Sequence, residues 1–303
     1  MIYFQNSAEG SEGLCNQLMS VFRAVGEALY HASEGSPAGI LLQNVQTRTS
    51  IDFDVTPYFR SIAIDCFVDV HALRQLLSSR QIDVKRAEEV HAEVRNQAVN
   101  CKRYAIRQMS AIENKNSGLF IANAFPFAKH IVELSNFIIA SMSEKHQWIA
   151  AHLRIEKDLL LISDIKSMGL EHYAESQLHC IYACMEAKQK VSAIYLASGL
   201  LDEEYAAIAK GTQEKNGDIM IYNKKIVLKG CPDLKQKFDS LCLEEQALVD
   251  WLVCIHAPYF IGPHSSSFSY LAGYMRHYRG YQPDTLELFP TYQPYWDMWF
   301  PCI

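Results

Sequence analysis

The fold is decided by residues 2–29, IYFQNSAEGSEGLCNQLMSVFRAVGEAL. This segment begins with a short apolar run, residues 2–4, which a polar loop with two glycines follows up to residue 13. The apolar residues of the last part recur at the spacing of one helix face, at Leu14, Leu18, Val21, Phe22, Val25 and Leu29. A strand, a loop and a helix in this order are typical of the start of a doubly wound α/β unit.

The same alternation recurs along the chain and starts again near residue 146. In the first half we expect strands at 39–42 and 118–122, and helices at 69–77, 84–109 and 126–142. In the second half we expect strands at 148–153, 193–197, 218–222 and 259–261, and helices at 170–188, from 202, at 243–256 and at 267–277. This alternation predicts parallel sheets, and the restart predicts two domains, residues 1–145 and 146–303. The predicted fold is α/β, with two Rossmann-like domains that face each other across a cleft.

The composition is that of a globular protein without excess positive charge. Lys and Arg number 28 and Asp and Glu number 34, so the formal net charge is −6. Such a chain has no general attraction for a phosphate backbone, which argues against a nucleic-acid partner. No uncharged apolar run approaches the roughly 18 residues of a membrane span, and the first residues lack the pattern of a signal peptide. We therefore expect a cytoplasmic protein without a membrane span.

The nine cysteines include no Cys-x-x-Cys pair, which argues against a zinc ribbon and against a thioredoxin-type site. Free, mostly buried thiols in a reducing compartment are the better interpretation. Asp52 and Asp54 form an Asp-x-Asp pair, which in some enzymes holds a divalent metal on a nucleotide diphosphate. With 34 acidic residues such a triplet arises easily by chance, so a surface loop is the favoured interpretation.

A first candidate site segment is HLRIEKD, residues 152–158, at the carboxyl end of a predicted strand. In an open α/β sheet this end faces the ligand. Arg154 offers a planar fork of donors that suits a pyrophosphate, and Asp158 could orient Arg154 or bind a ribose or a base. The alternative is a surface ion pair between Arg154 and Glu156 or Asp158, and the segment alone leaves both open.

A second candidate segment is IGPHSSSFS, residues 261–269, which follows a predicted strand and opens a helix. The hydroxyls of Ser265, Ser266 and Ser267, with the N–H groups of the first helical turn, can bind an anion without net positive charge. The alternative is a simple N-cap by one serine. Three consecutive serines exceed what capping needs, which favours the anion site.

A third candidate segment is SEGLCNQ, residues 11–17, between the first strand and the first helix. Gly13 allows close backbone approach, Asn16 and Gln17 could hydrogen-bond a sugar, and Glu12 could act as a general base. Taken alone, the segment is also compatible with an ordinary loop. It matches neither the dinucleotide fingerprint nor the P-loop.

Taken together, these segments resemble the GDP-fucose-dependent fucosyltransferase superfamily, which includes the protein O-fucosyltransferases, the plant O-fucosyltransferase-like and rhamnosyltransferase proteins, and the α-1,2- and α-1,6-fucosyltransferases. Residues 13–17 match the family's Gly-x-x-Asn-Gln loop. His152, Arg154 and Asp158 match its His-x-Arg signature with a downstream acid. Residues 249–254 and 265–269 match the helix and the Ser-containing turn of its third motif. The order holds from residue 2 to about residue 280.

The resemblance implies a GT-B fold and an inverting transfer that needs no cofactor and no essential metal. It implies that Arg154 neutralises the β-phosphate of the leaving nucleoside diphosphate, that His152 contacts the nucleotide, and that Asp158 contacts the base or the ribose. Ser265, Ser266, Ser267 and Phe268 would line the phosphate and base pocket. Gly13 and Asn16 would lie on the donor, and Glu12 resembles the catalytic carboxylate of one branch of the protein O-fucosyltransferases.

The donor that the resemblance favours is GDP-fucose, with UDP-rhamnose, UDP-xylose or another nucleotide sugar as the alternatives. We expect the second half of the chain to bind the donor and the first half to bind the acceptor, a glycan or a glycoprotein. Two other classes stay open at this point. One is a nucleotide- or sugar-binding module that has kept the fold without catalysis, and the other is a metal-dependent GT-A enzyme that uses Asp52 and Asp54.

Overall fold

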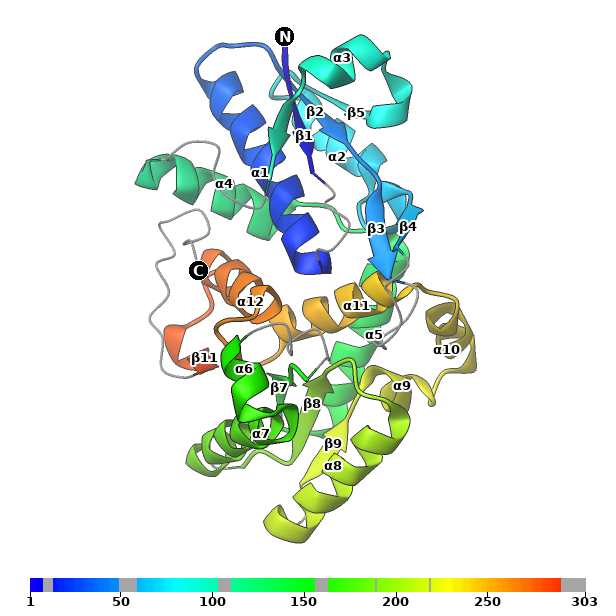
Figure 1. Ribbon diagram of the computed structural model, residues 1–303, viewed down its shortest axis with the longest axis vertical. Helices are drawn as coiled ribbons and strands as arrows, with labels where there is room; N and C mark the ends of the chain where they lie inside the picture. Colours follow the sequence, from blue (N-terminus) through cyan, green and yellow to red (C-terminus); the bar gives the residue numbers. More distant parts are fainter. Residues whose placement is uncertain are drawn as a thin grey trace.

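The computed structural model describes residues 1–7, 13–48, 59–102, 110–155, 163–188, 190–217 and 219–289. These residues include two parallel β-sheets, one from each half of the chain, with helices packed on them (Figure 1). A separate antiparallel pair of short strands accompanies the first sheet. The predicted α/β class with two parallel sheets is therefore confirmed.

The first sheet has the strand order β5-β2-β1-β6. Its strands are β1 (Ile2–Asn6), β2 (Ala38–Leu42), β5 (Ile82–Arg86) and β6 (Val99–Cys101). Phe4, Ile40 and Val84 lie side by side on neighbouring strands and share one face. They are buried in one cluster with α1 (Leu14–Ser33) and α2 (Val70–Ser78). Burial of these apolar side chains holds α1 on the first sheet, and the start of α1 lies beside α11 (Leu243–His256) and α12 (Ser267–Tyr278) (Figure 1).

The second sheet has the strand order β11-β10-β7-β8-β9. Its strands are β7 (Trp148–His152), β8 (Ala193–Ala197), β9 (Met220–Tyr222), β10 (Phe260–Pro263) and β11 (Leu286–Phe289). Every residue of β7 and β8 is buried, as expected for parallel strands covered on both faces. Ile149 and Ala151 pack in a cluster with α7 (Leu170–Ala187) and α8 (Asp202–Asn216). Trp148 and Ala150 pack on the side of α11 (Leu243–His256).

The two halves are joined by helix packing and by a buried ion pair. The helix α5 (Lys129–Lys145) packs against α11, and α12 (Ser267–Tyr278) packs against α1 and α4 (Ala111–Ala124). The antiparallel pair β3 (Val45–Arg48) and β4 (Phe59–Ile62) carries Arg48, whose Nε–H donates to the buried Glu244 of α11 over 2.8 Å. The described chain also contains α3 (Ala92–Gln97), α6 (Ser163–Met168), α9 (Lys224–Leu228), α10 (Pro232–Asp239) and 3₁₀ turns at Ile64–Cys66, Ala87–Glu89 and Pro283–Thr285. The division into domains at residue 145 stays a prediction.

Two predicted elements are wrong. Residues 84–102 form no long helix, because they contain the end of β5, the short α3 and β6; residues 103–109 lie outside the described residues. Ile82 and Val84 are buried while Asp83 and Lys85 are partly exposed, so this segment has the period of a strand, and pairing with β2 outweighs local helix propensity.

The strand predicted at 118–122 is the middle of the helix α4. Ser110 and Glu113 form a capping box that starts this helix. Gly118 lies where α12 crosses α4, and a Cβ there would lie 2.6 Å from the Tyr278 ring. The glycine inside the apolar run therefore reflects close helix packing and not a strand.

Candidate active site

His152, the last residue of β7, lies buried beside the start of α12. Its Nδ1 is 2.7 Å from Ser269 Oγ, and its ring packs on Phe268 with centroids 4.3 Å apart. Burial, with the positive charge of Arg154 as the second cause, lowers the pKa of His152 to about 3. The imidazole is therefore neutral at pH 7, with one N–H donor and one acceptor nitrogen. The structure thus brings His152 and Phe268 together from two elements.

Gly262 of β10 makes this arrangement possible. A Cβ at residue 262 would lie 3.2 Å from His152 Cβ and would overlap the Ser269 side chain. Any larger residue would therefore push His152 and Ser269 apart. Ser269 is fully buried and was not among the predicted site residues.

Arg154 follows β7 by two residues, at the carboxyl edge of the second sheet. The N–H and C=O of its backbone are both bonded to the side chain of Gln177 on α7. Burial raises the pKa of the Cys15 thiol, and the charge of Arg154 acts in the opposite direction. Cys15 lies in the first turn of α1, so the charge of Arg154 acts on the start of this helix.

The three serines differ in their surroundings. Ser265 is exposed, Ser266 is buried at the N-cap of α12, and Ser267 is the first helical residue. The Ser266 side chain makes no capping hydrogen bond, and among the described residues its buried Oγ has no hydrogen-bond partner. A buried hydroxyl without a partner is costly, and the adjacent helix N-terminus favours an anion. This geometry favours the anion-site interpretation over the simple N-cap.

A further polar cluster, which the sequence analysis did not assign to the site, lies at the carboxyl end of β8. Lys224 Nζ donates to Ser198 O over 3.2 Å and pairs with the buried Asp250, which also accepts a 2.6 Å bond from the Tyr195 hydroxyl. Burial raises the pKa of Asp250, and Lys224 opposes this shift. Within the part of the chain that is described, the buried Oγ of Ser198 has no hydrogen-bond partner. A carboxylate within the apolar run of α11, at residue 250, is the signal in the sequence that points to this cluster.

Three residues of the third candidate segment, Gly13, Asn16 and Gln17, lie at the start of α1. Gly13 is the N-cap of α1, with open space where a Cβ would be, and Asn16 lies partly buried in the first turn. The side chain of Gln17, which could hydrogen-bond a sugar, is bonded to the main chain of β3: its Nε2 donates to Gln46 O over 2.8 Å, and its Oε1 accepts from Gln46 N–H over 2.9 Å. The Gln17 amide therefore holds β3 against α1. Glu12, Asp158, Asp52 and Asp54 lie outside the described residues.

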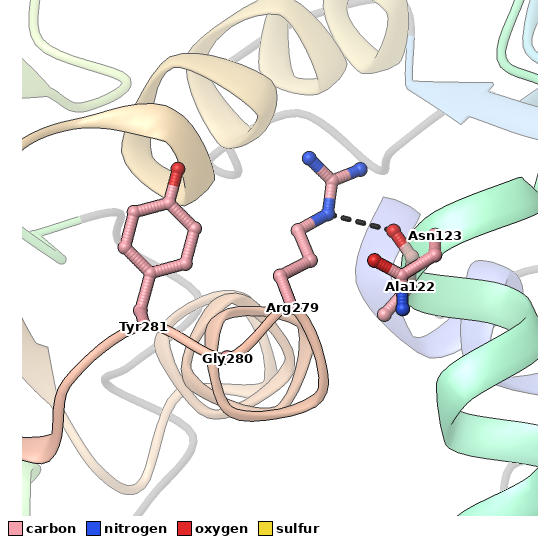
Figure 2. Close-up of a pocket in the computed structure, with 5 residues that line it drawn as sticks. All are labelled: Ala122, Asn123, Arg279, Gly280 and Tyr281. Carbon is pink, nitrogen blue, oxygen red and sulfur yellow. Dashed lines mark hydrogen bonds between the residues drawn. The ribbon is translucent and has the colours of Figure 1, made fainter.

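A surface pocket lies at the carboxyl end of α12, away from His152 and Ser266 at the start of this helix. Figure 2 shows its lining, which is Ala122, Asn123, Arg279, Gly280 and Tyr281. Arg279 Nε–H donates to Ala122 O over 2.7 Å, and its Nη1 lies 2.5 Å from His256 Nε2. Arg279 thus ties α4 to α11 and α12, so this pocket is a joint between helices and we do not place the donor there.

Other expectations concern metals, membranes and thiols. The described ranges contain no group of three or more His, Cys, Asp or Glu side chains placed to hold a metal ion. No helix within the same ranges is long and apolar enough to cross a membrane. The eight cysteines of the described residues are free thiols, and four of them are buried.

Comparisons with known proteins agree on one family and one fold. The sequence profile of the GDP-fucose protein O-fucosyltransferase family matches residues 63–279. Similar solved structures include POFUT1 in complex with GDP-fucose (11% identity, 96% of this chain, 98% of that chain, TM-score 0.57) and POFUT1 in complex with GDP (10%, 95%, 97%, TM-score 0.55). The fucosyltransferase NodZ from Bradyrhizobium is also similar (12%, 91%, 94%, TM-score 0.50). At these identities the likeness concerns the fold alone. No curated protein sequence matches significantly.

Proposed function

Because the chain belongs to the GDP-fucose protein O-fucosyltransferase family, we propose that it transfers L-fucose from GDP-fucose to a hydroxyl group of a glycan or a protein. The family and the fold make the chain a glycosyltransferase of the GT-B type. The choice of GDP-fucose as donor is supported by POFUT1, which has been crystallised with GDP-fucose, and by NodZ, which has been crystallised with GDP.

The observation that carries the proposal is that an arginine and a helix start with a buried, unpartnered hydroxyl follow two neighbouring strands of the second sheet. Arg154 follows β7, and Ser266, whose hydroxyl is buried, is the N-cap of α12 and follows β10. The strands β7 and β10 are neighbours in the second sheet. A planar guanidinium and the N-terminus of a helix are both suited to a diphosphate. Neutral His152, packed on Phe268, adds a hydrogen-bonding group without a charge.

In the proposed reaction, the acceptor oxygen bonds to the anomeric carbon of fucose while the bond from this carbon to the GDP oxygen breaks. The bonding electrons leave with GDP, and negative charge develops on the β-phosphate. Arg154 neutralises this charge, and contacts of this kind contribute about 3 kcal/mol to transition-state stabilisation. Glu12 is the proposed base that accepts the proton of the acceptor hydroxyl. Attack opposite to the leaving group inverts the anomeric configuration.

The proposal needs no metal ion, because Arg154 and the start of α12 supply the positive potential that a divalent cation supplies in other transferases. Turnover that continues in excess EDTA would support this point, and loss of turnover that Mg²⁺ or Mn²⁺ restores would contradict it. We further propose that the second half of the chain binds the donor and that the first half binds the acceptor. The cytoplasmic location stays a prediction.

The experiment that tests the donor is thermal unfolding with GDP, UDP, CMP or ATP, each with and without Mg²⁺, followed by turnover assays with the matching sugar nucleotides. A nucleotide at about 100 times its Kd stabilises the folded chain by about 2.7 kcal/mol, which shifts the Tm visibly. A response to GDP and release of GDP from GDP-fucose support the proposal. A response to UDP alone moves the donor to UDP-rhamnose or UDP-xylose, and binding without turnover of any donor indicates a binding module.

A further inference from the structure

Gln177 occupies a position where an apolar side chain is expected. In α7 the buried residues are Gln177, Ile181, Cys184 and Met185, which follow the i, i+4, i+7, i+8 pattern of a core-facing stripe. Gln177 is only 1% exposed, and the other three residues of the stripe are buried in one apolar cluster with Ile149, Ala151 and Leu153 of the β7 segment. A carboxamide in such surroundings is costly unless all of its hydrogen bonds are made.

The partners of this carboxamide are on the backbone of Arg154. Arg154 N–H donates to Gln177 Oε1 over 3.0 Å, and Gln177 Nε2 donates to Arg154 O over 2.7 Å. The same Nε2 lies 3.4 Å from Tyr173 O, one turn earlier in α7. One side chain therefore pairs both main-chain groups of one residue, as a neighbouring strand would do.

Arg154 needs such a partner because it lies where the chain leaves the sheet. The main-chain pairing of β7 with β8 continues through Leu153, whose N–H donates to Ala197 O over 3.0 Å. At the next residue, Arg154, the side chain of Gln177 on α7 pairs the main chain in place of β8. These bonds fix the backbone of Arg154 at the carboxyl edge of the sheet. They therefore also fix the position from which the Arg154 side chain extends.

We infer that Gln177 is a positioning residue that acts through Arg154, a role that rests on the proposed function. The chain uses the same device in its first half, where Gln17 pairs both main-chain groups of Gln46 and holds β3. At Gln177 the residue held is the one that neutralises the leaving group. A displacement of a catalytic group by about 1 Å can lower turnover about 100-fold. The hydrogen bonds of Gln177 to Arg154 are therefore expected to affect the rate as well as the stability.

The test is a double-mutant cycle with Gln177→Met and Arg154→Ala. Gln177→Met keeps the length and volume of the side chain but removes its hydrogen bonds to Arg154 and to Tyr173 O. In the otherwise wild-type chain we expect kcat/KM for GDP-fucose to fall about 10- to 100-fold. In the Arg154→Ala chain the same substitution is expected to change kcat/KM by less than about twofold, because the residue through which Gln177 acts is absent.

The control is Ile181→Val, one turn further along α7 in the same buried stripe, which lowers stability but leaves the hydrogen bonds of Gln177 to Arg154 in place. This variant is expected to lower the Tm and to leave kcat/KM within about twofold of wild type. Should Gln177→Met fail to fold, Gln177→Asn takes its place in the cycle, since it keeps an uncharged carboxamide but is one methylene too short to pair both main-chain groups of Arg154.

Equal losses in both backgrounds would overturn the inference, because Gln177 would then act independently of Arg154. Turnover within twofold of wild type for Gln177→Met would overturn it as well. Both results leave the proposed function intact, since the wild-type chain still turns over GDP-fucose. Absence of turnover in the wild-type chain with every donor overturns the proposed function and, with it, the role of Gln177.

Discussion

Ser266→Ala separates the two roles considered for the serine turn, because they predict opposite effects on stability. The Ser266 side chain is 6% exposed and makes no capping bond to α12, and in the described part of the chain its Oγ has no partner. A buried hydroxyl in this state costs about 1–3 kcal/mol. Removal of the oxygen is therefore expected to leave the free energy of unfolding unchanged or to raise it by about 1 kcal/mol, a rise in Tm of about 2 °C.

The same substitution is expected to weaken nucleotide binding. A hydroxyl that donates to a phosphate oxygen contributes about 1.5–3 kcal/mol, so the Kd for GDP should rise about 10- to 150-fold. Both quantities can be measured on one preparation, by thermal unfolding without ligand and by calorimetric titration with GDP. A variant that is more stable alone and binds GDP less tightly is the signature of a hydroxyl held for a ligand.

Ser269→Ala is the matched control, three residues further along α12. Its hydroxyl is already bonded to His152 Nδ1 over 2.7 Å. Its loss leaves a buried ring nitrogen unpaired and should destabilise the protein by about 1–3 kcal/mol even without ligand. If Ser266→Ala instead destabilises the free protein by about 1 kcal/mol or more, the hydroxyl caps the helix. An unchanged Kd for GDP would show that Ser266 does not contact the nucleotide.

Two further predictions concern catalysis and acid stability. Arg154→Ala is expected to lower kcat/KM for GDP-fucose about 100- to 1000-fold. Arg154→Lys is expected to recover only part of this loss, because an ammonium cannot bind a phosphate bidentately. An Arg154→Ala enzyme within a few-fold of wild type in a GDP-release assay would refute the role of Arg154. Burial, with the charges of Arg279 and Arg276 as further causes, lowers the pKa of His256 to about 4 from its ordinary 6.5. The unfolded chain therefore binds a proton between these values that the folded chain does not, so His256 stabilises the fold above pH 6.5 and this stabilisation is lost as the pH falls towards 4. The decrease in Tm from pH 7 to pH 5 should be smaller in His256→Gln, and an equal decrease in both proteins would contradict the assignment.

The sequence predicts well those elements whose apolar pattern has a clear period. The helices at α1, α7, α11 and α12 and the buried strands β7 and β8 were expected within a few residues of their observed bounds. The strands β5 and β6 and the helix α4 were missed. Their local signals are weak or misleading, and contacts from elsewhere in the chain decide them: pairing with β2 and β1 for the strands, and packing of α12 for α4.

The site was only partly predictable for a related reason. His152 and Phe268 could be singled out because their segments follow predicted strands and resemble two motifs of the fucosyltransferase superfamily. The order β10-β7-β8, which brings their segments side by side, is a tertiary fact that no local pattern contains. Gln177 could not be found in this way, because its partner is the main chain of Arg154, and main-chain groups leave no trace in the residue types.

The net charge of the chain is consistent with a site in which a few local groups attract the donor. A protein of net charge −6 does not attract an anionic donor at long range, so the attraction must arise from local groups. In the proposed site, Arg154 and the start of α12 supply the positive potential, while burial keeps His152 neutral at pH 7. His152 therefore does not titrate between pH 5 and 8. A pH dependence of turnover in that range would therefore report a group other than His152, and the base that accepts the acceptor proton is the first candidate.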